Sequence, residues 1–291
     1  MKFFRRLAIL LMFLLLLAAA YYLFYGPPVR VFQGQDQGTG KAFTSTEDFP
    51  ARPPLPESDD RQGERSIALI IDDIGFNLGP LKELLKINSP LAFAVLPYAP
   101  HAVAAAELIH EQGREIMLHL PMEPRGGKED PGPGALFRAL PEVEIRKRVA
   151  EALAAVPYVV GANNHMGSAF MEDEEKLEIV LGELQSRGLF FIDSRTTSAS
   201  RAGALAARSG IRFAARGLFL DNNQEQAVIF NNLLEHLEKT AQTNTVIIGH
   251  PYPGTVKALQ EAIPLLRSRG IRFVAPSEIV KRSKKSNNQQ E

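Results

Sequence analysis

The sequence predicts an α/β protein, a (β/α) barrel of seven or eight parallel strands. Two observations support this prediction: short apolar runs alternate with longer amphipathic stretches, and several of the runs are apolar at every position. Alternating strands and helices give a parallel sheet, and a parallel strand is buried on both faces, so it has no polar face. The strand-like runs are residues 67–71, 91–96, 115–118, 158–161, 189–192, 211–214, 245–248 and 271–275.

The stretches between these runs predict helices, among them residues 103–112, 141–155, 172–186, 225–240 and 256–268. Three of them are followed by Gly113, Gly188 and Gly270, which suits a helix that ends in a left-handed residue. Seven or eight such units favour closure into a barrel over an open doubly wound sheet. The absence of a glycine-rich dinucleotide fingerprint after the first run also argues against the open sheet.

Three further segments flank the predicted barrel of residues 66–281. Residues 1–25 hold Lys2, Arg5 and Arg6 before a long apolar run, which predicts a membrane anchor with the barrel in the periplasm or extracytoplasmic space. Small residues at 18–20 leave a cleaved signal peptide, and so a secreted protein, as the alternative. Residues 26–65 are rich in proline and polar residues and predict a disordered tether, and the polar residues 282–291 predict a disordered tail.

The composition excludes several classes of site. With 33 basic and 33 acidic residues there is no basic excess, so we expect no nucleic-acid partner. The chain contains no cysteine, so disulfides and thiolate zinc sites are excluded, and His, Asp or Glu must hold any metal. The absence of tryptophan leaves tyrosine and phenylalanine as platforms for sugar stacking.

Ionisable residues recur where the predicted strands end, which is where active sites of such barrels lie. The pair Asp72-Asp73 follows the first strand, and two adjacent carboxylates repel unless a metal or a cation lies beside them. The other candidates are His119 after the third strand, Asn163, Asn164 and His165 in a polar segment that we interpret as a loop after the fourth, Asp193 at the end of the fifth, and His250 after the seventh. We interpret His101, His110 and His236 as solvated helix residues.

Carboxylates with imidazoles suit zinc or another divalent first-row ion that keeps positions open for water. Such a metal activates water and polarises a carbonyl, while a second carboxylate serves as general base and a histidine as general acid. A glycosidase needs two carboxylates and no histidine cluster, so the histidines favour hydrolysis of an amide or ester. We count Asp193 with the catalytic candidates, and Asn163 and Asn164 as candidate substrate-binding residues.

With these residues identified, the sequence resembles the polysaccharide deacetylases with their NodB-like barrel, and within them the divergent branch. The resemblance covers residues 67–280 and rests on three segments: His119-Leu-Pro-Met-Glu-Pro, Asn163-Asn-His-Met-Gly-Ser and Gly249-His-Pro. It implies that Asp72 is the general base, Asp73 and His119 are metal ligands, and His250 is the general acid. It also implies a zinc cofactor and an N-acetylated polysaccharide or peptidoglycan as the substrate.

The chain departs from the mainstream family at the second metal histidine, which comes four residues after the first. Glu123 occupies that position here. We therefore expect His165 to complete the ligand set, with Glu123 as the substitute. The departure keeps open a glycan- or partner-binding envelope protein with reduced catalysis. The absence of tryptophan keeps open the hydrolysis of a different envelope ester or amide.

Overall fold

The structure is a computed structural model that describes residues 65–240 and 244–282. The predicted anchor, and the predicted tether and tail apart from Arg65 and Arg282, lie outside these ranges. Among the described residues, no helix is long and apolar enough to cross a membrane.

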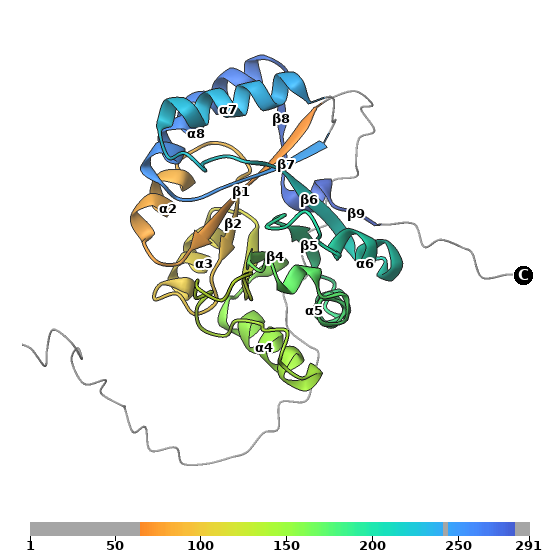
Figure 1. The fold of residues 1–291 in the computed structure, drawn as a ribbon. Coiled ribbons are helices and arrows are strands. Elements are labelled where there is room, and N and C mark those ends of the chain that lie inside the picture. Colours follow the sequence, from red (N-terminus) through yellow and green to blue (C-terminus); the bar gives the residue numbers. More distant parts are fainter. Residues whose placement is uncertain (1–64, 241–243, 283–291) are drawn as a thin grey trace, which may run out of the picture. The chain divides into compact units, whose positions relative to one another are not determined.

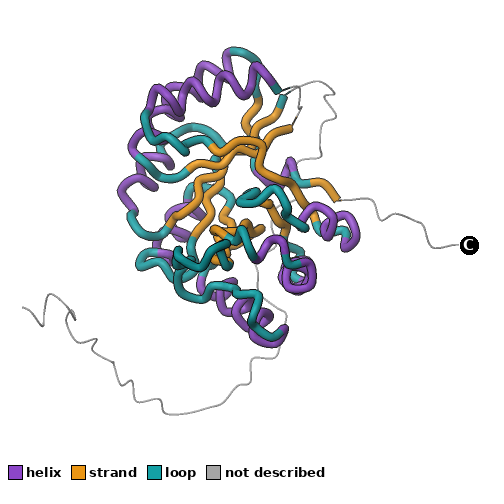
Figure 2. The backbone as a smooth tube through the Cα atoms, viewed as in Figure 1, coloured by secondary structure: helices purple, strands orange, loops and turns teal. Residues whose placement is uncertain are grey.

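Seven parallel strands close into a barrel, because each strand pairs with the next and the seventh returns to the first. Figure 1 shows the helices around the strands, and Figure 2 separates the inner strands (orange) from the outer helices (purple). The barrel strands are β1 (Ser66–Ile74), β2 (Ala92–Val95), β3 (Ile116–Met122), β4 (Val159–Met166), β5 (Phe190–Asp193), β6 (Arg212–Phe219) and β7 (Asn244–Gly249). The prediction of a closed barrel is confirmed, with seven strands.

The connections between the strands are helical. The elements are α2 (Leu78–Leu85), α3 (Ala102–Glu111), α4 (Glu142–Ala155), the short η1 (Phe170–Glu172), α5 (Glu174–Ser186), α6 (Ala202–Ser209), α7 (Gln226–Lys239), α8 (Pro253–Ser268) and α9 (Pro276–Ile279). Side-chain caps start two of them: Asn77 accepts the amide of Gly79 before α2, and Asp173 accepts the amide of Lys176 before α5. These caps satisfy amides that have no partner within the helix.

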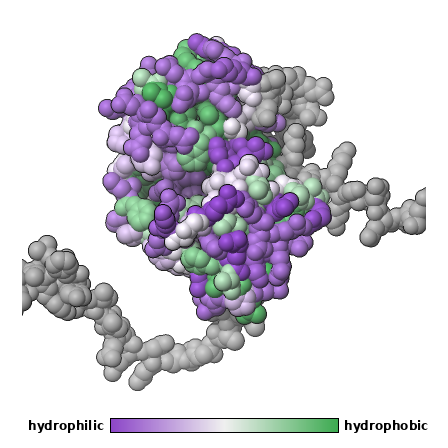
Figure 3. Space-filling view, viewed as in Figure 1, coloured by the Kyte–Doolittle hydropathy of each residue, from purple (hydrophilic) through white to green (hydrophobic). Residues whose placement is uncertain are grey.

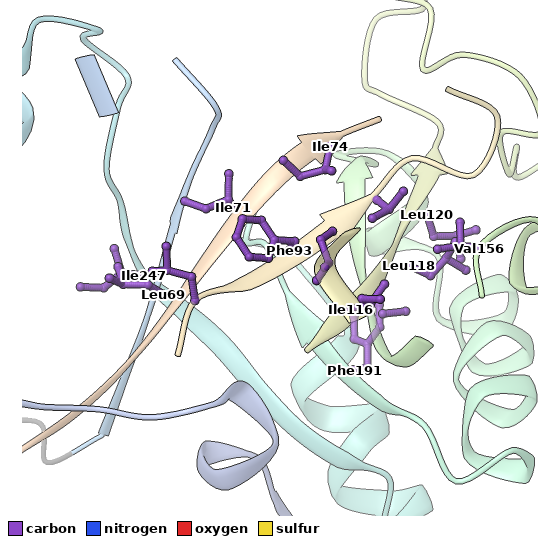
Figure 4. Close-up of a cluster of buried hydrophobic side chains, with 14 of the residues drawn as sticks. Leu69, Ile71, Ile74, Phe93, Ile116, Leu118, Leu120, Val156, Phe191 and Ile247 are labelled. Atoms are coloured by element: carbon purple, nitrogen blue, oxygen red, sulfur yellow. The ribbon is translucent and has the colours of Figure 1, made fainter. Parts of the chain in front are cut away.

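Alternate residues of each strand supply two apolar layers. On β1, Ile67, Leu69 and Ile71 belong to the layer that packs under the helices, whereas Ala68 and Ile70 belong to the interior of the barrel. Figure 4 shows the helix-side layer, in which Leu69 and Ile71 lie near Phe93 and Ile247. The space-filling view in Figure 3 shows a largely hydrophilic face with hydrophobic residues in separate areas.

Two details of the predicted strands were wrong. The eighth run, 271–275, forms only the two-residue β8 (Arg272–Phe273), which pairs with the first residues of β1 outside the ring. The first, third and fourth strands extend beyond the predicted runs, so Asp72-Asp73, His119 and the segment from Asn163 to His165 lie within strands. Polar residues persist in these strands because the site provides their hydrogen-bond partners. A short strand β9 (Lys281–Arg282) pairs antiparallel with β6.

Candidate metal centre

Strand register brings the predicted site residues together at the carboxyl ends of the strands. His119 of β3 lies directly opposite Asn163 of β4. Ile71 of β1 lies opposite Gly249 of β7, so the next residues, Asp72 and His250, lie side by side at this end of the barrel. Asp72 continues the alternation of Ala68 and Ile70 and therefore faces the barrel interior. The site is thus the polar end of the layer that fills the barrel.

Asp73 reaches the same site through an unusual backbone. A regular strand would direct its side chain away from Asp72, because successive residues face opposite sides. Asp73 has φ +56°, in the left-handed region that residues other than glycine rarely adopt. This conformation breaks the alternation and turns its carboxylate toward the two histidines.

Asp73, His119 and His165 form one compact cluster. Asp73 Oδ1 lies 3.2 Å from His119 Nε2 and 3.0 Å from His165 Nδ1, and the two ring nitrogens are 3.1 Å apart. Asp73 Oδ1 is buried and makes no well-oriented hydrogen bond to either histidine. These three atoms are the metal-ligating group that the described residues offer here.

The cluster fits a zinc ion. Ligands about 2.0 to 2.1 Å from a tetrahedral zinc lie roughly 3.3 Å from one another, close to the separations observed. A buried carboxylate oxygen that points at two imidazole nitrogens without a hydrogen bond is the arrangement that a cation satisfies. Three protein ligands leave a fourth position for water or substrate, as in catalytic zinc sites. The structure therefore brings together three of the four predicted ligands.

The charges of the cluster explain its protonation. Burial works to raise the pKa of Asp73, but His119 and His165 outweigh it and hold that pKa well below the usual range. Burial works to lower the pKa of His119, but Asp72 and Asp73 outweigh it and raise that pKa to about 9. Without a metal, His119 is therefore a cation at neutral pH that neutralises part of the repulsion between the paired carboxylates.

Asp72 lies beside the cluster and is almost completely buried, at 2% exposure. Its Oδ1 accepts a hydrogen bond from Asn163 Nδ2 at 2.8 Å, and its Oδ2 lies 3.7 Å from His119 Nε2. Burial raises the pKa of Asp72, and the nearby His119 and the Asn163 hydrogen bond partly oppose that rise. A carboxylate with a raised pKa beside a metal can take a proton from water.

His250 lies next to Asp73, with Nε2 3.7 Å from Asp73 Oδ2, and is oriented by a residue that sequence reasoning missed. Asp221, buried just after β6, pairs through Oδ1 with His250 Nδ1 at 2.9 Å. Asp221 Oδ2 accepts the His250 amide at 2.6 Å and the Thr255 hydroxyl at 2.7 Å. Burial works to lower the pKa of His250, but Asp221 outweighs it and the pKa is raised. Asp221 was missed because the predicted sixth strand ends at residue 214, whereas β6 extends to Phe219 and so brings Asp221 to the strand end.

The remaining candidates lie outside the cluster. Glu123 accepts the Arg138 amide at 2.7 Å and pairs with its guanidinium at 3.2 Å. Asp193 is buried and accepts the amide of Arg195 at 2.7 Å. Asn164 is buried, donates to the Met166 carbonyl at 2.8 Å and accepts the Ser194 amide at 2.9 Å. Substrate contact by Asn163 or Asn164 and catalysis by Asp193 stay predictions.

The other histidines behave differently from one another. His101 and His110 are exposed, and the His110 ring stacks on Tyr158 with centroids 3.8 Å apart. His236 is only partly exposed, and its Nε2 is buried without a hydrogen-bond partner. Burial, together with the charge of Arg65, lowers its pKa. The interpretation of His236 as a fully solvated residue was therefore wrong.

Solved structures share this fold. A protein of Agrobacterium tumefaciens described as uncharacterised protein ATU2773 is 20% identical, covers 75% of this chain and 89% of its own, and superposes with a TM-score of 0.71. The Bc1960 peptidoglycan N-acetylglucosamine deacetylase is 18% identical over 77% of this chain and 91% of its own, with a TM-score of 0.51. A mutant of BA3943, described as a CE4 family pseudoenzyme with restored enzymatic activity, is 15% identical over 75% and 68% of the two chains, also at 0.51.

Sequence comparison gives the family. The protein YibQ of Escherichia coli K12, described as uncharacterised, is 34% identical over 200 residues, which are 68% of this chain and 62% of YibQ. The matched region thus spans less than two thirds of that relative. The profile of the divergent polysaccharide deacetylases matches residues 69–280, which include the whole cluster and its neighbours. The chain therefore belongs to the divergent polysaccharide deacetylase family.

Proposed function

We propose that this protein is a zinc-dependent deacetylase that hydrolyses N-acetyl groups of an envelope carbohydrate. The observation that carries the proposal is the convergence of Asp73 Oδ1, His119 Nε2 and His165 Nδ1 within about one zinc coordination sphere. The family and the fold shared with a peptidoglycan N-acetylglucosamine deacetylase support an N-acetylated glycan as the substrate class.

The proposed roles follow from the positions of the side chains. The bound metal would polarise the acetyl carbonyl and lower the pKa of water at its open position. Asp72 would take a proton from the attacking water, because it is buried beside the cluster and its pKa is raised. His250 would donate a proton from Nε2 to the amine nitrogen as the C–N bond breaks, since its Nδ1 is engaged by Asp221. Acetate and the free amine are the products.

The test uses the purified full-length chain in detergent. Zinc is measured in the protein, and acetate release is followed on N-acetylglucosamine oligomers and on peptidoglycan fragments. Asp72→Asn should retain zinc and lose about 10²- to 10⁴-fold in turnover, the usual contribution of a positioned general base. His101→Asn, at an exposed histidine outside the metal-ligating cluster, is the matched control and should keep both properties.

A second candidate function is a glycan- or partner-binding protein with reduced catalysis. The altered ligand set favours it, because the position of the mainstream second histidine holds Glu123, which is paired with Arg138. The related fold of BA3943, described as a pseudoenzyme, shows that this fold also occurs in proteins so described. Zinc-loaded wild type that binds these glycans without releasing acetate would support this function and overturn the first.

We also propose that residues 1–25 anchor the chain in the inner membrane and place the barrel outside the cytoplasm. The charge asymmetry before a long apolar run supports this topology. Protease added to intact spheroplasts should degrade the barrel if the proposal holds. Protection of the barrel there would contradict it, and release into the medium would favour the cleaved alternative.

A further inference from the structure

Asn163 joins the metal cluster to the buried carboxylate that lies beside it. Its side chain has no exposed surface, and both ends of its amide are engaged. Its Oδ1 lies 2.8 Å from His119 Nδ1, and its Nδ2 lies 2.8 Å from Asp72 Oδ1 and 3.3 Å from Ser194 Oγ. One amide therefore contacts a metal ligand on one side and the proposed general base on the other.

The chemistry of these groups allows one arrangement of hydrogens. An ionised carboxylate only accepts hydrogen bonds, so the Asn163 NH₂ group must face Asp72. The Asn163 oxygen then faces His119, and His119 Nδ1 must carry the proton that it accepts. With Nδ1 protonated, the lone pair of a metal-bound His119 lies on Nε2, the atom that faces Asp73 and His165.

We propose that Asn163 is a positioning residue that fixes the His119 tautomer through its oxygen and holds Asp72 through its NH₂ group. In this proposal Asn163 has a positioning role instead of the predicted substrate contact, since its side chain has no exposed surface. Partners of this kind orient metal-binding histidines and raise their basicity. This inference rests on the metal site of the proposed function.

Two nearly isosteric substitutions separate the two halves of the amide. Asn163→Asp keeps an acceptor for His119 Nδ1 but places a carboxylate 2.8 Å from Asp72 Oδ1, where a donor was. Asn163→Leu removes both the acceptor and the donor. Asn164→Leu is the matched control, because Asn164 is the next residue, is equally buried and directs its hydrogen bonds to Met166 and Ser194 instead of the cluster.

The experiment measures zinc affinity of the full-length chain by competition with a chelator, together with kcat and KM for acetate release. Asn163→Leu should lose about 10- to 100-fold in zinc affinity, the usual effect of removing a partner of a metal-binding histidine. Asn163→Asp should bind zinc within a few-fold of wild type and lose about tenfold or more in kcat, with KM unchanged. Asn164→Leu should be less stable and bind zinc like wild type.

Several outcomes overturn the inference. Equal zinc affinity of Asn163→Leu and wild type would exclude the tautomer role. A rise in KM of the Asn163 variants with no change in kcat or zinc affinity would instead support a substrate contact by Asn163. If Asn163→Asp fails to fold, the comparison of Asn163→Leu with Asn164→Leu still decides the role of the oxygen. A wild type that binds zinc but releases no acetate contradicts the proposed deacetylase and leaves the affinity order as the test of Asn163. A wild type without zinc affinity contradicts both.

Discussion

The two ends of the barrel use left-handed backbone conformations in different ways. Where helices lead into strands, Gly113, Gly188, Gly210 and Gly270 have φ between +64° and +81°, and a Cβ on any of them would meet nothing within 4 Å. Where strands lead out of the barrel, glycines such as Gly75 and Gly167 also have positive φ, but so do three residues with a Cβ: Asp73, Met166 and Arg195, at +56°, +52° and +49°. The helix-to-strand end has one exception, Tyr158, whose ring stacks on His110.

This difference separates structural turns from the site. Glycine adopts a left-handed conformation without a steric cost, so the helix-to-strand turns need nothing more than flexibility. A residue with a Cβ costs about 1–2 kcal/mol in the same conformation, and such strain concentrates at functional sites. The chain accepts that cost at Asp73, whose carboxylate is thereby turned to the two histidines.

The first prediction concerns the strand-to-loop end, where Asp221 orients His250. Asp221→Asn should lower turnover by about 10²-fold or more, because a general acid contributes about 10²- to 10⁴-fold and depends on its orientation. Asp221 raises the pKa of His250, so its loss should lower that pKa. A general acid works only while protonated, so the alkaline limb of the pH–rate profile should move to lower pH.

Thr255→Val is the companion variant, because it removes only the hydroxyl bonded to Asp221 Oδ2. It should leave the alkaline limb near its wild-type position, because the Asp221 carboxylate that raises the His250 pKa is retained. An alkaline limb that stays in place in Asp221→Asn would show that His250 does not set it.

The second prediction concerns the metal-free cluster and its stability. His119 has a pKa of about 9 in the folded protein against an ordinary value of 6.5. A group with a raised pKa stabilises the fold fully below its unfolded value and loses that contribution as pH rises through its folded value. The Tm of chelator-treated protein should therefore fall between pH 6.5 and about 9.

Zinc should oppose this loss, because metal binding requires the unprotonated nitrogen and strengthens as pH rises. The Tm increase caused by zinc should thus grow across the same pH range. His119→Asn should flatten the pH dependence of the metal-free protein, whereas His101→Asn should leave it. If the Tm of the metal-free protein does not change from neutral to alkaline pH, Asp72 and Asp73 do not raise the pKa of His119 as described.

The third prediction places a Cβ at a left-handed glycine and removes the Cβ from a left-handed arginine. Gly188→Ala should lower the free energy of unfolding by about 1 kcal/mol, because the left-handed strain exceeds the stabilisation that comes from the lower conformational entropy of the unfolded chain. Arg195→Gly should raise it by up to about 1 kcal/mol, since its side chain is exposed and its backbone hydrogen bonds are retained. Urea unfolding measures both. A destabilised Arg195→Gly would show that the strand-to-loop end is not strained there.

Much of the site was predictable because β-strands alternate and parallel strands end on one edge. The prediction placed Asp72, His119 and His250 there, and the structure places all three at that end of the barrel. Asp221 was not predicted as a site residue, because nothing in its sequence neighbourhood, Leu220-Asp221-Asn222, distinguishes it from a turn residue. The sequence also did not decide whether Glu123 or His165 is the third ligand. Glu123 pairs with Arg138, fifteen residues away, and that pairing depends on how the loop between them folds.

The alternation of strands and helices, the apolar layers and the set of side chains available for a metal all follow from the sequence alone. Those properties depend on local periodicity and on residue types. The tertiary structure decided that seven strands close the ring, that the polar segment from Asn163 to His165 is a strand, and that Asp73 turns to face the histidines. These depend on pairing between distant segments and on one strained backbone angle, which no local pattern encodes.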